Sequence, residues 1–352
     1  MSHRSPRSPR RNLWLRAGVP ALVVAAAAAA ARPTPDASAT TAAPAPGLRT
    51  SAAALHAAVS TVRDSALVAL APVPRGGLDD AMADLTAALV PGGDELRGRS
   101  GKLRARFVEP RRGMEVAAIS RLFGEKELST PGVHPLPEEA TGQPFSLITL
   151  VPFEQKVRGR IGTYRMGFWP GEQGRARSEA YGNPAGFIQV TKENQDTHLS
   201  EHFRLRDFLT KDQFAVWPKY VVLREELLDK LELVIQELEA SGTPVKHVSV
   251  MSGFRTPQYN ANGGNTAGRA SNSRHQYGDA ADVFVDNDRN GRLDDLNGDG
   301  RVDTRDVRVM IAAVERVERR YPELVGGAGV YKATSAHGPF IHVDVRGSRA
   351  RW

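Results

Sequence analysis

The chain of 352 residues contains no cysteine. Disulfides, thiolate zinc sites and cysteine nucleophiles are therefore excluded together. The absence is compatible with an oxidising compartment, but it does not demonstrate one. Any metal site must accordingly be built from histidine, carboxylate and carbonyl ligands.

A general surplus of positive charge is also missing. The formal net charge is +7, but five of the positive residues lie within the first nineteen positions, where there is no acid. Without them the charge is about +2, which is too small to argue for a polyanion partner. Nucleic acid is therefore not expected as a partner. These five residues are Arg4, Arg7, Arg10, Arg11 and Arg16.

Long apolar runs are lacking as well. Residues 13–31 are apolar apart from Arg16 and Pro20, and their uninterrupted core spans only residues 21–31. A membrane span needs roughly 20 apolar residues. With the basic start and the small residues that follow, this predicts a signal peptide over residues 1–31, a retained single anchor being the alternative. We expect export to the periplasm or cell envelope, or secretion, and no stable membrane span after cleavage.

Residues 32–50 consist largely of Pro, Ala and Thr and are predicted to form a linker. Residues 51–144 are poorly defined by pattern and partly helical, forming either a helical hairpin or a stalk. From residue 145 to 197 apolar residues alternate in short runs, which predicts a small β unit with strands at 145–152, 160–169 and 186–191.

Residues 198–352 are expected to form the main domain. The segment 223–238 has leucine, valine and isoleucine on one helical face, and Gly242 follows it. A buried strand over residues 245–251 then leads into residues 252–257, SGFRTP. Arg255 therefore lies near a strand end, where a guanidinium can hold a carboxylate or a polarised carbonyl, a structural ion pair being the alternative. Tyr259, Asn260 and Ser273 are predicted to contact substrate.

Three separated residues have the chemistry of a catalytic zinc site. His275 and Asp282 lie seven residues apart, with Gly278 between them to allow a sharp turn, and His342 follows in the β-like segment FIHVDV. Two imidazole nitrogens and one carboxylate leave a fourth position of a tetrahedral zinc ion open for water. The sequence therefore predicts that His275, Asp282 and His342 bind Zn²⁺.

The residues SGFRTP, the spaced set Ser273, His275, Gly278, Ala280 and Asp282, and the run HVDVR at 342–346 resemble the D-Ala-D-Ala carboxypeptidase family of zinc peptidases. The similarity covers about residues 199–352 and is nearest to the murein endopeptidase branch. It implies an α+β fold with a central antiparallel sheet of the hedgehog type and flanking helices. It also implies an exported zinc metallopeptidase that hydrolyses stem or cross-bridge peptides of peptidoglycan, with Arg255 contacting substrate.

The chain departs from this family at one position. Many members have an acid three residues before the last zinc ligand, where this chain has Pro339. His337 matches a histidine with which some members stabilise the transition state. Asp344 shares a strand face with His342. His337 and Asp344 are therefore the candidates for proton transfer or for orienting a ligand, and a carboxylate from elsewhere is the alternative.

An acidic insert over residues 286–306 lies between the second and third zinc ligands. Two registers match the offsets of a calcium-binding loop, in which oxygen ligands alternate and a glycine occupies the sixth position. We expect the calcium, if bound, to be structural, and a solvated acidic loop is the alternative. The better register is Asp295, Asn297, Asp299, Arg301 through its carbonyl, Asp303 and Asp306; the weaker is Asp286, Asp288, Asn290 and Asp294.

The sequence leaves two other classes of function open. A catalytically silent module would keep the metal and bind cell-wall peptide without cleaving it. A calcium-dependent scaffold would keep the acidic insert and carry a vestigial zinc motif. A pair of histidines at 198 and 202 also has metal-ligand spacing, but local packing is favoured because no third ligand lies nearby.

Overall fold

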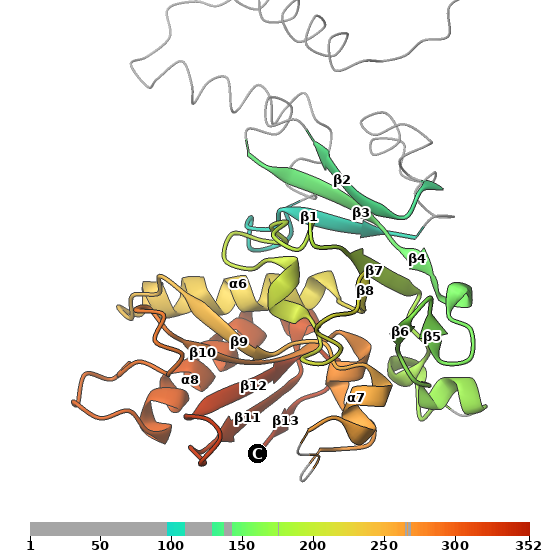
Figure 1. Cartoon of the computed structure of the whole chain (residues 1–352). Helices are drawn as coiled ribbons and strands as arrows, with labels where there is room; N and C mark the ends of the chain where they lie inside the picture. The colour runs from blue at the N-terminus through green and yellow to red at the C-terminus, as the bar shows by residue number, and fades with distance from the viewer. Residues whose placement is uncertain (1–96, 110–128, 137–142, 175, 265, 267–268) are drawn as a thin grey trace, which may run out of the picture. The chain divides into compact units, whose positions relative to one another are not determined.

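The computed structural model describes residues 97–109, 129–136, 143–174, 176–264, 266 and 269–352 (Figure 1). The predicted signal peptide, the linker and most of the segment 51–144 lie outside these residues. All described residues belong to one compact unit. None of the helices in the described ranges combines the length and apolar character that a membrane crossing requires.

The central element is a five-stranded sheet in the order β13-β11-β12-β10-β9. Neighbouring strands are antiparallel, except that β13 is parallel to β11. The mixed α+β class predicted from the sequence is confirmed. The strand bounds are β9 Val248–Ser252, β10 Ala280–Val285, β11 Gly327–Tyr331, β12 Phe340–Asp344 and β13 Ala350–Arg351.

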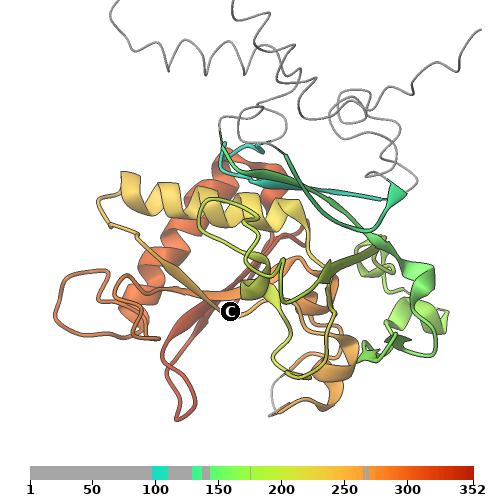
Figure 2. The same ribbon diagram turned by 45° about the horizontal axis from the view of Figure 1, so that its top comes forward.

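Two long helices, α6 (Glu225–Ala240) and α8 (Thr304–Arg320), pack against each other, and α8 also packs on β11 and β12 (Figure 2). The apolar face predicted for the helix near 223–238 is buried in α6, which confirms that helix. A third helix, α7, spans Pro257–Asn262. Alternation along β12 separates Ile341 and Val343, which are fully buried, from His342 on the opposite face.

The remaining strands of the described chain form three small sheets, with strand orders β1-β3-β2, β4-β7-β8 and β5-β6. The predicted strand at 145–152 is divided in two, the one at 160–169 is a short hairpin, and the one at 186–191 is present. The bounds are β1 Ala105–Val108, β2 Gly132–Leu136, β3 Phe145–Thr149, β4 Val151–Pro152, β5 Arg160–Ile161, β6 Tyr164–Arg165, β7 Gly186–Val190 and β8 Lys219–Val221.

The small β unit and the main domain share one core. Strand β8 lies beyond the expected boundary at residue 198, yet it pairs with β7 before that boundary. The indole Nε1 of Trp169 donates a hydrogen bond of 2.9 Å to the carbonyl of Gln276, which lies next to the predicted zinc ligand His275. Residues of both segments belong to a single cluster of buried apolar side chains. The segment 145–197 is therefore part of the framework of the candidate site.

Candidate metal centre and pocket

The three predicted zinc ligands come from three elements that the sheet brings together. Asp282 on β10 is paired with His342 on β12. His275 lies in a 3-10 helix, Arg274–Tyr277, that ends at Gly278. Gly278 has φ +68°, and an added Cβ would lie 2.3 Å from the carbonyl oxygen of Val222. Only glycine allows the chain to turn here and enter β10. The sharp turn predicted at Gly278 is therefore confirmed.

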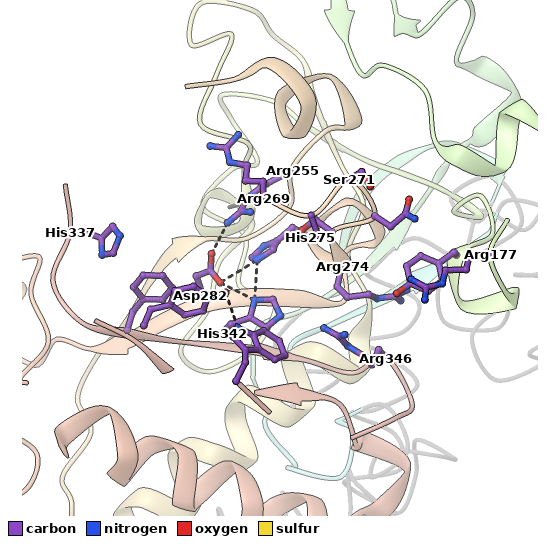
Figure 3. Close-up of a pocket in the computed structure, with 17 residues that line it drawn as sticks. Arg177, Arg255, Arg269, Ser271, Arg274, His275, Asp282, His337, His342 and Arg346 are labelled. Atoms are coloured by element: carbon purple, nitrogen blue, oxygen red, sulfur yellow. Dashed lines mark hydrogen bonds and ion pairs between the residues drawn. The ribbon is translucent and has the colours of Figure 1, made fainter. Parts of the chain in front are cut away.

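The ligand atoms of the triad converge on one point (Figure 3). His275 Nε2 lies 3.2 Å from Asp282 Oδ1 and 3.2 Å from His342 Nδ1. His342 Nδ1 lies 2.9 Å from the same carboxylate oxygen. Tetrahedral zinc with bonds of about 2.0–2.1 Å holds its ligand atoms about 3.3 Å apart. The spacing of the three atoms therefore fits this ion.

Contacts on the far side of each imidazole fix its tautomer. His275 Nδ1 lies 2.7 Å from the carbonyl oxygen of Gly253, and His342 Nε2 lies 3.0 Å from Asp344 Oδ2. Both partners are acceptors, so these two nitrogens carry the hydrogens. In the neutral rings, the lone pairs of His275 Nε2 and His342 Nδ1 then face each other beside a carboxylate. Only a proton or a cation between them makes this arrangement favourable.

The protonation states of the triad suit a metal ion. Burial lowers the pKa of His275, because the imidazolium form loses its hydration. Burial acts to raise the pKa of Asp282, but the adjacent His275 and His342 outweigh it and hold that pKa well below its ordinary value. Burial likewise opposes protonation of His342, yet hydrogen bonds to Asp282 and Asp344 raise its pKa. Protons therefore compete with metal chiefly at His342.

Asp344 is fully buried beneath the triad. It accepts hydrogen bonds from His342, from the backbone N–H of Gly327 at 2.7 Å and from Arg346. Its main-chain oxygen accepts from Lys230 Nζ at 2.8 Å, and Lys230 is itself paired with a buried acid of α8. Of the two roles predicted for Asp344, these contacts support orientation of a ligand.

The triad lies in a pocket of about 810 Å³. Among the described residues that line it, Asp282 is the only carboxylate, whereas five are arginines. The predicted residues Arg255, Ser273 and His337 line this pocket, and Figure 3 shows Arg177 on the side of the triad away from His337. The other lining residues include Tyr181, Arg269, Arg274, Tyr331, Phe340, Arg346 and Trp352.

Arg255 is placed by two polar contacts at the pocket wall. Its Nη2 lies 2.6 Å from Asp282 Oδ2, and its Nε donates to Ser252 Oγ at 2.8 Å. Asp282 Oδ1 faces the two imidazoles, so one carboxylate binds the guanidinium and the triad through different oxygens. The structural ion pair that the sequence left open is therefore present, and Arg255 remains at the pocket surface as well.

Two residues predicted to contact substrate lie behind the pocket wall. Asn260 is buried, and its Nδ2 donates to the carbonyl of Ala270 at 3.0 Å. The carbonyl of Tyr259 accepts from Arg269 Nη1 at 3.0 Å, and the Arg269 guanidinium lies over the Tyr259 ring. Both therefore hold the loop that carries lining residues 269–273. His337 bonds to its neighbour Gly338 through Nδ1 and contacts the ring of Phe340.

Several lining residues were not predicted. Arg177 and Tyr181 come from the small β unit, nearly a hundred residues before His275, so no local pattern could connect them with it. Tyr331 lies on β11 and Trp352 directly follows β13, and the neighbours of these two strands are known only from the fold. The alternating glycines of the segment GAGVY, residues 327–331, were the only signal that could have found this wall.

The acidic insert repeats one hydrogen-bond pattern nine residues apart. Asp286 accepts from the backbone N–H groups of Asn290 and Gly291, at 2.9 and 3.1 Å. Asp295 accepts from those of Asp299 and Gly300, at 3.2 and 2.7 Å. The first position of each predicted calcium register therefore closes its loop on the fifth and sixth positions.

The two registers differ in how their carboxylates are arranged. Ligand oxygens of Asp286, Asp288 and Asp294 lie within 4.8 Å of one another, as those of the zinc triad do. In the other register, Arg305 forms ion pairs with Asp299 and Asp303. Asp306 is buried and accepts from the backbone of residues 296, 297 and 303. The carboxylates that lie close together therefore belong to the register that matched the calcium-loop offsets less well.

Comparison with known proteins found no matching family model and no matching solved structure. CTP synthases of two Thermus thermophilus strains are 33% identical over 102 residues, covering 26% of this chain and 18% of theirs. The CTP synthase of Deinococcus radiodurans is 32% identical over 134 residues, 33% of this chain and 23% of its own. The chain spans about a fifth of the length of these curated relatives, and a similarity of this extent assigns neither family nor function.

Proposed function

We propose that the chain is an exported zinc-dependent peptidase of the D-Ala-D-Ala carboxypeptidase type, which hydrolyses peptide bonds of peptidoglycan. The observation that carries this proposal is the convergence of His275 Nε2, Asp282 Oδ1 and His342 Nδ1, with both tautomers fixed, at the wall of a large pocket. The peptide substrate is inferred from the resemblance of the motifs to this family. Endopeptidase and D,D-carboxypeptidase activity both fit these observations.

The chain's own residues would share the work as follows. A bound zinc ion would polarise a water molecule and the scissile carbonyl. Asp344 holds the tautomer and orientation of His342. Arg255 lies beside Asp282 at the pocket wall, where its guanidinium can donate to a substrate carbonyl or carboxylate.

Proton transfer is assigned to His337. Pro339 occupies the position where many relatives have an acid, and the only carboxylate on the described pocket lining is the ligand Asp282. His337 lines the same pocket, and its Nδ1 is engaged with the carbonyl of Gly338, so its Nε2 is the basic nitrogen. An imidazole nitrogen can accept a proton and later donate it, which suits this role.

The same lack of a second carboxylate favours one competing function. A module that keeps zinc and binds cell-wall peptide without cleaving it would need the triad and the cationic lining but no base. His337→Ala distinguishes the two. A peptidase loses turnover and keeps zinc, whereas a binding module shows no turnover before or after the change and binds sacculi equally well.

The acidic insert is assigned a structural role. The gathered carboxylates of Asp286, Asp288 and Asp294 have the charge and oxygen chemistry that calcium prefers. Asp286 also accepts a hydrogen bond of 2.8 Å from Ser249 on β9, so an ion bound here would fix the insert to the central sheet.

Digestion of purified sacculi tests the function. We expect wild-type protein with one zinc per chain to release muropeptides that mass spectrometry assigns to cleavage of one peptide bond. His342→Ala should lack both zinc and the new products. Zinc-loaded wild-type protein that leaves the muropeptide profile unchanged would contradict the peptidase and favour the binding module.

A further inference from the structure

An indole lies on the central sheet beside the metal centre, in a space made by two glycines. An added Cβ at Gly329 would lie 2.4 Å from Nε1 of Trp352, and one at Gly327 would lie 3.0 Å from its Cη2. Gly329 is paired across the sheet with His342. The missing side chains on this face of β11 therefore allow the Trp352 ring to lie flat against the strand, next to a zinc ligand.

The position of this ring is fixed by several contacts. Trp352 Nε1 donates to the hydroxyl of Tyr331 at 2.9 Å, and its main-chain oxygen accepts from Val330 at 2.9 Å. The Tyr331 ring is stacked on Phe340, with centroids 4.6 Å apart and planes within 4°. The Arg346 guanidinium lies 5.5 Å from the Trp352 ring centroid. The two exposed rings are thus held rigidly by the strands beneath them.

Both rings are unusually accessible for large aromatic side chains. Trp352 is 49% exposed and Tyr331 is 37% exposed, and both line the pocket. The Trp352 ring centroid lies 5.2 Å from that of His342. Its only polar group is already bonded to Tyr331, so the exposed indole surface offers apolar contact alone.

We propose that Trp352 and Tyr331 form a specificity-determining aromatic shelf, which binds the aliphatic side chain of the peptide residue next to the scissile bond. The inference rests on the proposed peptidase function. Because the shelf begins at a zinc ligand, only groups close to the reacting carbonyl can reach it. Aliphatic carbon gains by covering exposed indole, whereas a charged side chain would lose hydration there.

The arginine side of the pocket has the opposite chemistry. Arg269 donates to two backbone carbonyls and stacks on Tyr259, so its charge is not neutralised by these contacts. Arg177 is exposed on the same pocket. A peptide that crosses the metal centre therefore meets apolar surface at one wall and positive charge at another, which orients it in a single direction.

Two synthetic peptides that differ only in alanine or glycine beside the scissile bond test the shelf. We expect wild-type protein to favour alanine in kcat/KM by about tenfold, the discrimination that one methyl group supports in an apolar site. Trp352→Ala should bring this ratio close to one, mainly through KM, while zinc content stays at one per chain. Gly329→Ala, which displaces the indole without removing it, should do the same. Phe214→Ala, which removes an aromatic ring that is 77% exposed and does not line the pocket, is the matched control.

The outcomes distinguish failure of the aromatic shelf from failure of the peptidase function on which it rests. Cleavage by wild type with an unchanged alanine-to-glycine ratio in Trp352→Ala overturns the shelf and leaves the peptidase standing. Loss of zinc in Trp352→Ala also overturns it, because the residue would then only support the metal ligand. If wild-type protein cleaves neither peptide, these two substrates contradict the proposed peptidase function. Calorimetric titration of both peptides into zinc-loaded wild type and Trp352→Ala then decides the shelf: equal affinities in the two proteins overturn it.

Discussion

The metal triad and the acidic insert are two candidate cation sites built on different principles. In the triad, His275, Asp282 and His342 are buried, and the polar atoms that do not face the centre are tied to other parts of the fold. In the insert, the carboxylates mostly accept hydrogen bonds from the backbone of their own loop. The triad is therefore positioned by the whole sheet, whereas the insert is positioned mostly by its local chain, with Asp286 bonded to Ser249 on β9.

This difference predicts different consequences of losing each ion. The elements that carry the triad, β10, β12 and a short helix, are held by the core and by the sheet, so loss of the metal should abolish the proposed hydrolysis and leave the fold intact. Most carboxylates of the insert accept hydrogen bonds only from their own loop, so ion loss should leave the chemistry and loosen the loop. Three changes test this contrast.

The largest effect is expected for His275→Ala. Removal of one of three ligands should abolish zinc binding at one equivalent and lower peptide hydrolysis by about 1,000-fold or more, because several kcal/mol of transition-state stabilisation depend on the ion. Metal analysis and muropeptide mass spectrometry measure both effects. His198→Ala is the matched control, because His198 contacts Ser200 in the chain before α6 and should keep zinc and turnover.

An intermediate effect is expected for Asp344→Asn. Loss of the charge beside His342 should weaken zinc binding by about 10–100-fold. Hydrogen bonds to Asp282 and Asp344 raise the pKa of His342, so protons displace zinc from wild type as pH falls through this raised pKa. Without the Asp344 charge, the zinc dissociation constant should start from a weaker value but begin to rise with acidity only at a lower pH. Zinc titrations with a competing chelator between pH 5 and 8 follow this shift, and an onset that is unchanged or moves upward would contradict it.

The smallest effect is expected in the insert. Calcium at about 100 times its dissociation constant should raise the melting temperature by about 5 °C, with little change in turnover. Asp288→Ala should remove most of this rise if the gathered register binds the ion, and Asp299→Ala should do so if the other register does. Arg301→Ala is the control, because only the backbone carbonyl of that residue is a predicted ligand. Calorimetry that detects no calcium binding would remove the ion from this site.

The parts of the fold that follow a local period could be predicted from the sequence. The helix α6 and the strand β7 were found because apolar side chains recur at 3.6 or 2 residues. The division at residue 198 had no such basis, and the pairing of β7 with β8 across it depends on contacts between distant segments. Tyr164 and Trp169 of the predicted strand at 160–169 are buried in the shared core, a placement that likewise depends on distant segments.

The metal triad could be predicted because its residues carry a chemical signature in their spacing. The pocket around it could not, since Arg177, Tyr331 and Trp352 reach it from separate elements. Tyr259 and Asn260 were assigned to substrate from their place after the strand, but side chains on a short helix point to two sides. The structure shows theirs supporting the loop behind the wall.

The two hydrogen bonds that join the small β unit to the triad's neighbours limit how far the protein can be shortened. Trp169 holds the carbonyl of Gln276, and Arg274 donates to the carbonyl of Ala180 at 2.7 Å. These bonds flank His275 on both sides. A fragment that begins at residue 198 would keep all three predicted zinc ligands, yet it would lose both hydrogen bonds that hold the segment around His275. A fragment meant to keep the candidate site must therefore begin before the β unit, although that unit supplies none of the predicted zinc ligands.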